Sequence, residues 1–155
     1  MNKPVLAYHA IFSAYGFWLP NDPRGSWSDF VGAWDLFRAG GKATKTDETR
    51  SVAHRPHDRF QRLAAKEALA RPPVVFTDVQ VRTIGAGFAN AVKKSQLTIW
   101  ACAIMPDHVH CAIARSHLSI EQAVNLLKGE AFAPCQMAWK CRRSGFWDRV
   151  ISARG

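Results

Sequence analysis

Two histidines separated by a single residue are the chemically most informative feature of this 155-residue sequence. His108 and His110 lie in a run rich in strand-forming residues, and alternate side chains of a strand share one face. Both imidazoles are therefore expected on one face, where they can converge on one divalent cation, while Val109 points into apolar surroundings. Two imidazoles leave coordination positions open for phosphate oxygens and water. Spacing alone also fits a structural pair, because His-x-His is common by chance.

The residues around this pair form a longer pattern. Residues 104–110, IMPDHVH, resemble the signature of the HUH single-tyrosine transposases, of the REP-associated and insertion-sequence type. In that signature a strand, a turn with proline and a polar residue, and His-hydrophobic-His follow in this order. Residues 8–12 are similar to the family's first strand, residues 124–129 to its helix after the motif, and residues 146–151 to its Phe-Trp-acid strand.

The resemblance implies a specific chemistry. It implies that His108 and His110 hold Mg or Mn, which polarises the scissile phosphate of single-stranded or hairpin DNA. In the family a tyrosine then attacks, leaving a 5′-phosphotyrosine link and a free 3′-hydroxyl, so that strands are cleaved and rejoined in DNA transposition. The metal acts electrostatically and the tyrosine covalently.

The tyrosines depart from the family pattern. The sequence contains only Tyr8 and Tyr15, and both precede the histidines. In the family the nucleophile lies on a helix after the final strand, about where this sequence ends, so no catalytic residue is assigned and DNA cleavage is in question. A cleavage-deficient DNA-binding remnant is thus an alternative function. Tyr8 is either a substitute nucleophile or a core residue, since its strand is expected beside the histidine strand.

Composition points to nucleic acid as the partner. The formal net charge is +9, the sequence pI is about 9.9, and there are six tryptophans. A proline-rich loop combines aromatic and basic residues suited to unpaired bases and phosphates, and a second, basic cluster lies near the C-terminus, although either can also be a solvated surface. The candidate DNA contacts are Trp18, Arg24 and Trp27 in the loop, and Lys140, Arg142 and Arg143 in the cluster.

A histidine-triad nucleotide hydrolase is a further alternative, because such enzymes carry His-x-His-x-His. Here Ala112 occupies the third position, and the high positive charge favours a polymeric substrate. Among the remaining histidines, His9 is the one to check as a ligand because of its predicted strand.

Apolar periodicity and turn residues predict the elements that position the histidines. Strands are expected at residues 5–14, 97–105, 108–115 and 146–151, with helices at 56–70, at 77–94 and from Ser119 until Pro134 stops the last one. Thr77 and Ser119 are the expected N-caps. This order predicts one HUH transposase-like domain, residues 1–155, with a long loop insertion around 16–56. The fold class is α+β, a ferredoxin-like antiparallel sheet with helices on one face.

Further features concern the compartment and the assembly. No apolar run approaches the roughly 20 residues of a membrane-spanning helix, and the first residues lead directly into a strand, so a cytoplasmic protein without a membrane partner is expected. The four cysteines form no Cys-x-x-Cys pair and are expected to be buried thiols. Both monomers and dimers occur among the transposases that the sequence resembles, so a homodimer is one of two expected states.

Overall fold

The computed structural model describes residues 4–22, 33–42, 56–138 and 147–154, and for residues 132–138 and 147–154 it describes the backbone only. The elements are β1 (Ala7–Ala14), α1 (Trp34–Gly40), α2 (Arg59–Glu67), α3 (Asp78–Ser95), β2 (Ile99–Ile104), β3 (His108–Ala114), α4 (Ile120–Ala138) and β4 (Trp147–Arg154). Each predicted strand and helix is present, with its ends shifted by a few residues.

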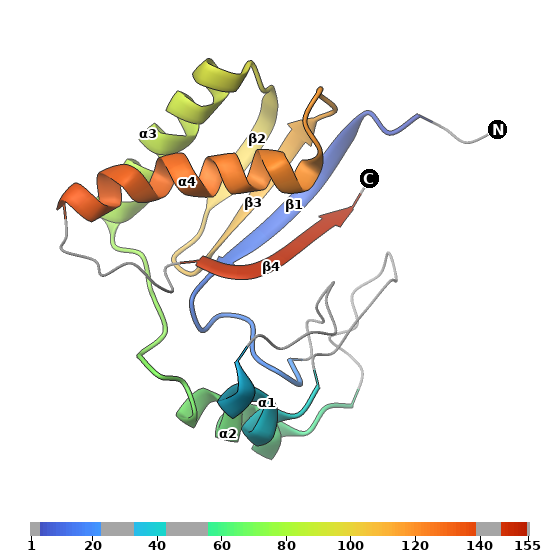
Figure 1. The fold of residues 1–155 in the computed structure, drawn as a ribbon, viewed down its shortest axis with the longest axis vertical. Helices are drawn as coiled ribbons and strands as arrows, with labels where there is room; N and C mark the ends of the chain where they lie inside the picture. Colours follow the sequence, from blue (N-terminus) through green and yellow to red (C-terminus); the bar gives the residue numbers. More distant parts are fainter. Residues whose placement is uncertain (1–3, 23–32, 43–55, 139–146, 155) are drawn as a thin grey trace.

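The four strands form one sheet in the order β2-β3-β1-β4, and every neighbouring pair is antiparallel. Helices α3 and α4 both cover the same face of this sheet, whereas α1 and α2 lie beyond one end of it (Figure 1). The predicted α+β class, a ferredoxin-like antiparallel sheet with helices on one face, is therefore confirmed. Because β1 and β3 are the two inner strands, each of them is hydrogen-bonded to a neighbouring strand on both of its edges.

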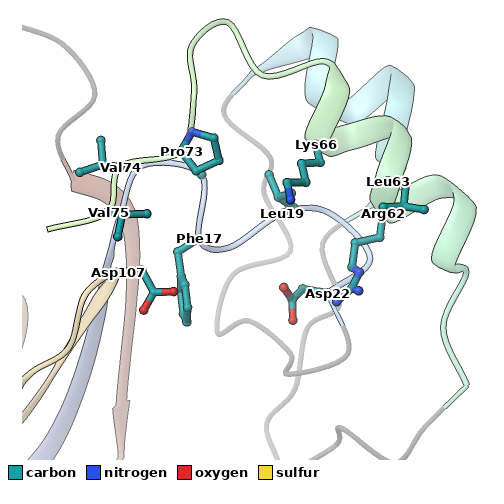
Figure 2. Close-up of a pocket in the computed structure, with 11 residues that line it drawn as sticks. Phe17, Leu19, Asp22, Arg62, Leu63, Lys66, Pro73, Val74, Val75 and Asp107 are labelled. Carbon is teal, nitrogen blue, oxygen red and sulfur yellow. The ribbon is translucent and has the colours of Figure 1, made fainter.

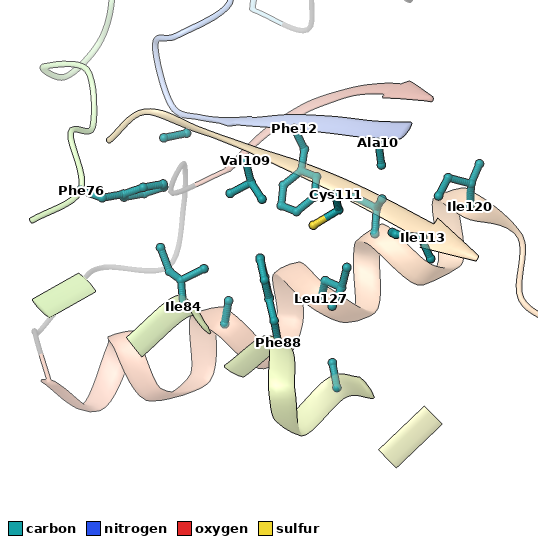
Figure 3. Close-up of a cluster of buried hydrophobic side chains, with 14 residues drawn as sticks. Ala10, Phe12, Phe76, Ile84, Phe88, Val109, Cys111, Ile113, Ile120 and Leu127 are labelled. Atoms are coloured by element: carbon teal, nitrogen blue, oxygen red, sulfur yellow. The ribbon is translucent and has the colours of Figure 1, made fainter. Parts of the chain in front are cut away.

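Alternating residues of β1 and β3 form the core with the two covering helices. Phe12, Val109 and Cys111 are fully buried, and the ring of Phe88 from α3 meets that of Phe12 edge to face at 5.9 Å (Figure 3). Helix α4 adds an apolar stripe to this core, and each member of the stripe is buried. Its members are Ile120, Val124, Leu127 and Ala131.

Helices α3 and α4 approach each other closely at a glycine. A Cβ on Gly87 would lie 2.6 Å from both the Cα of Ala131 and the carbonyl oxygen of Glu130, so only glycine fits there. The ammonium of Lys94 also reaches the carboxylate of Glu130 at 2.8 Å.

Both predicted helix caps are present. The hydroxyl of Thr77 accepts from the backbone N–H of Gln80, whose side chain accepts from the N–H of Thr77 in return. Ser119 and Gln122 form the same reciprocal pair at the start of α4. Each pair satisfies backbone donors that the first helical turn leaves without partners.

The end predicted for α4 is wrong. The helix continues through Pro134 to Ala138, although proline lacks the N–H that would bond to the carbonyl of Glu130. That carbonyl lies where α4 contacts Gly87 of α3. Tertiary structure can outweigh local helix preference in this way.

The long loop predicted around residues 16–56 is wrong in one part, because it contains α1. This helix has only seven residues and no side-chain cap at Ala33, so its sequence gives no start signal. Contact with α2 holds it in place: a Cβ on Gly40 would lie 2.6 Å from the Cβ of Ala65.

The prediction of buried cysteines holds for Cys111 and is wrong for Cys102. Both are free thiols and face each other across β2 and β3, with their sulfurs 3.4 Å apart. Cys102 is exposed because β2 is an edge strand.

Candidate functional site

The two histidines of the motif share the sheet face that α3 and α4 leave uncovered. His108 and His110 are half-buried, whereas Val109 between them is completely buried in the core. Their ring centroids are 4.8 Å apart and the rings are inclined by 70°. The predicted placement on one face of a central strand is thereby confirmed.

A third imidazole joins them from β1. The Nε2 atom of His9 lies 3.0 Å from Nδ1 of His110, and the two rings are nearly parallel at 5.2 Å. In the strand register His9 faces Ala112, the position that a histidine triad would fill from β3 itself. The contact occupies Nδ1 of His110 and leaves its Nε2 as the nitrogen for another ligand.

His108 is oriented by two neighbours. Its Nδ1 lies 2.7 Å from Oδ1 of Asp107, and the ring of Phe17 stacks on it at 4.6 Å with an angle of 17°. The carboxylate accepts the Nδ1 proton of a neutral ring, so Nε2 carries the lone pair. A carboxylate behind a histidine in this way is the usual support of a metal-ligating imidazole.

The protonation state of His110 also suits a ligand. Burial, and then the neighbouring His108 and His9, hold the pKa of His110 below its ordinary value of 6.5. The neutral imidazole, the form that binds metals, is therefore favoured near neutral pH.

These donors fit a divalent cation as an incomplete set. Among the described residues no group of three or more His, Cys, Asp or Glu side chains is arranged to hold a metal. His9 does not complete such a group because its Nε2 is directed at His110. The Nε2 atoms of His108 and His110 are two nitrogen donors, and hard cations such as Mg²⁺ need oxygen ligands from elsewhere.

Ser13 is a polar residue of this site that the sequence did not single out. It is opposite His108 in the register of β1 and β3 and is completely buried. Within the described part of the chain its hydroxyl has no hydrogen-bond partner. A buried hydroxyl without a partner is unfavourable by about 1–3 kcal/mol.

Neither tyrosine of the sequence is placed as a nucleophile. Tyr8 pairs with Ile113 and packs against the core, so it lies on the face opposite the histidines. The ring of Tyr15 lies under the guanidinium of Arg71 at 5.4 Å. The interpretation of Tyr8 as a core residue is the one that the structure supports.

Of the candidate DNA contacts, Trp18 is the one that the structure describes. It is half-buried and meets the ring of Phe17 edge to face at 5.4 Å, which links it to His108 through a chain of rings. The other five lie outside the described residues. They are Arg24, Trp27, Lys140, Arg142 and Arg143.

A family model described as IS200-like transposase matches residues 70–152, which is just over half of the chain. The chain belongs to the IS200-like transposase family. The matched part contains α3, the hairpin with both histidines, α4 and most of β4, whereas β1, α1 and α2 precede it. A search of curated proteins gave no match for the chain.

In the part of this transposase-family chain that the structure describes, we find no helix with the length and apolar character needed to cross a membrane.

Proposed function

We propose that this member of the IS200-like family binds single-stranded or hairpin DNA across the uncovered face of its sheet. His108 and His110 would hold Mg or Mn there for the cleavage and rejoining of strands in transposition. The observation that carries the proposal is the orientation of the two rings: each has its Nδ1 engaged by a neighbour, so both Nε2 atoms remain as ligands. When bound, the cation polarises a phosphate oxygen of the DNA.

The chain's own residues prepare this face for a phosphate. Asp107 fixes the ring of His108, His9 fixes that of His110, and Phe17 covers His108. Because the set offers only two nitrogen ligands, we propose that DNA phosphate completes the coordination shell, so that metal and DNA bind synergistically.

Charge and aromatic residues support DNA as the partner. The net charge of +9 favours a polyanion, and the rings of Phe17 and Trp18 lie next to the histidine pair. We propose Trp18 for base stacking, together with the basic and aromatic residues named from the sequence. These are Arg24, Trp27, Lys140, Arg142 and Arg143.

A second candidate, DNA binding without cleavage, is favoured by the position of Tyr8. Its ring packs against the core and not beside the histidines, and Tyr15 lies under Arg71. We therefore expect residues 1–155, acting as a single domain in monomers or homodimers, to form no covalent tyrosine adduct with DNA.

The test measures binding of a labelled single strand by fluorescence anisotropy, with and without Mn²⁺. The wild-type chain is expected to bind more tightly when Mn²⁺ is present, and a His108→Ala/His110→Ala variant is expected to lose this increment. Equal enhancement in that variant contradicts the metal site. A denaturing gel separates the two candidate functions: a covalent protein–DNA band that Tyr8→Phe abolishes would make Tyr8 the nucleophile.

A further inference from the structure

A cavity of about 300 Å³ lies beside the histidine pair. It is enclosed by the segment after β1, by α2 and by the segment that leads into α3 (Figure 2). Its lining combines apolar, cationic and carboxylate side chains. The residues used below are Phe17, Leu19, Asp22, Arg62, Lys66 and Asp107.

The cavity adjoins the histidines through two shared residues. Asp107 lines the cavity and bonds to Nδ1 of His108, and Phe17 lines it and stacks on the same ring. A group in the cavity is therefore separated from His108 by one side chain. Two consecutive nucleotides of one DNA strand can therefore reach the cavity and the histidine pair.

The turn at Gly16 shapes this junction. Its φ of +82° is a conformation that other residues rarely adopt, and a Cβ there would lie 3.0 Å from the Cα and Cβ of Pro73. Glycine at this position lets the chain after β1 turn tightly against the segment before α3. The wall that separates the cavity from the histidines thus depends on the backbone conformation of Gly16.

The charges in the cavity are of both signs. Arg62 and Lys66 extend from the same side of α2, and Arg62 points toward Asp22, as Figure 2 shows. Asp22 is only 4% exposed, so its carboxylate is a buried acceptor at the cavity wall. Cations suit a phosphate, and a carboxylate suits the N–H donors of a base.

We propose that this cavity takes one unpaired nucleotide next to the phosphate bound at His108 and His110, an inference that rests on the proposed function. Arg62 and Lys66 bind its phosphate. Its base lies against the apolar wall of Phe17 and Leu19, with an amino group directed at Asp22. Of the four DNA bases only thymine lacks an exocyclic amine and offers a carboxylate its ring N3–H alone, so an amino group directed at Asp22 favours the other three bases over thymine.

The volume of the cavity agrees with a single bound nucleotide. Its volume is at the lower end of the range of roughly 300–1,000 Å³ for small-ligand sites. Phe17, Asp22, Arg62 and Lys66 precede the residues that the family model matches, whereas Pro73, Val74, Val75 and Asp107 lie within them. The cavity therefore combines residues from inside and outside the matched part of the chain.

The test compares two charge-matched double variants of the whole chain in anisotropy titrations with labelled oligo(dC) over a range of salt concentrations. Arg62→Ala/Lys66→Ala removes the two cavity cations. Arg82→Ala/Lys93→Ala removes one exposed arginine and one exposed lysine from α3, which lies on the other face of the sheet. Circular dichroism checks that both variants are folded.

The cavity variant should bind about fivefold more weakly than the wild type at 0.1 M salt, because the loss of one phosphate contact on a single strand removes about 0.7 from the salt slope. Its slope should therefore be lower by about 0.7. The α3 variant should change by less than about threefold, since charges beyond roughly 10 Å are screened. Equal losses in the two variants overturn the cavity site and leave the proposed function intact, whereas no binding of any strand by the wild type overturns both.

Competition between unlabelled oligo(dC) and oligo(dT) tests the base contact. The wild type should prefer oligo(dC) by about fivefold or more, the lower limit for one base-specific contact. Asp22→Asn, in which the amide offers both a donor and an acceptor, should reduce this preference. No preference in the wild type contradicts the assignment of Asp22 to the base.

Discussion

The two faces of the sheet are built from the same strands and serve different purposes. On the face covered by α3 and α4, side chains such as Phe12 and Val109 are completely buried within one apolar cluster. The neighbouring residues along the same strands point to the other face. There His9, His108 and His110 have polar partners and stay accessible. Because successive residues of a strand point to opposite faces, substitutions can change the stability of the fold and the chemistry of the histidine site independently. Substitutions on the two faces therefore test this division directly.

The largest effect is expected on the covered face. Phe12→Ala should lower the free energy of unfolding by about 3–5 kcal/mol, because it removes a fully buried ring that contacts Phe88. His110→Ala should change it by less than about 1 kcal/mol, because His110 is only half-buried on the uncovered face. Urea denaturation measures both. Similar losses would mean that the histidine face is part of the core.

Two glycines test how closely α3 and α4 pack against each other on the covered face. Gly87→Ala should destabilise by about 1–3 kcal/mol, since the new Cβ would overlap the backbone of α4 at Ala131. Gly129→Ala in α4 is the matched control: nothing lies within 4 Å of its Cβ position, so it should stabilise by up to about 1 kcal/mol. If both substitutions shifted stability in the same direction, the close contact of α3 with α4 would be wrong.

On the uncovered face, Asp107→Ala should weaken Mn²⁺ binding in the presence of DNA by about 10–100-fold, because the ring of His108 loses the partner at Nδ1. Its effect on unfolding should be within about 0.5 kcal/mol, as Asp107 lies in an exposed turn. Isothermal titration with Mn²⁺ measures the affinity. A loss of stability with unchanged affinity would make Asp107 a structural residue of the turn.

The smallest expected effect is a change in the pH dependence of Mn²⁺ binding. The pKa of His110 is held below 6.5 by burial and by the two neighbouring histidines, and only the neutral ring binds a metal. Protonation of His110 should therefore weaken Mn²⁺ binding only below pH 6.5, by about tenfold for each pH unit below its pKa. Titrations in the His9→Gln variant should move this loss to higher pH, because one of the neighbours that lower the pKa is gone. A shift to lower pH would exclude the effect assigned to His9.

Local patterns of the sequence predicted the sheet, the helices on its covered face and the shared face of His108 and His110. These features follow from periodicity and capping residues close together in the chain, such as Thr77 with Gln80. The partners of the histidines do not follow in this way. His9 is 101 residues from His110 along the chain, and Phe17 reaches His108 only through the pairing of β1 with β3. No local signal specifies such contacts, and the same holds for α1, which depends on α2.

Paramagnetic broadening by Mn²⁺ tests the central claim most directly. In an assigned NMR spectrum of the chain with a single-stranded oligonucleotide, substoichiometric Mn²⁺ should broaden the signals of His108 and His110 first. The side-chain signals of Val124 and Leu127, which pack on the covered face, should be broadened least. The His108→Ala/His110→Ala variant should lose the selective pattern. Broadening centred on the covered face, or unchanged in the variant, would contradict the assignment of the metal to this histidine pair.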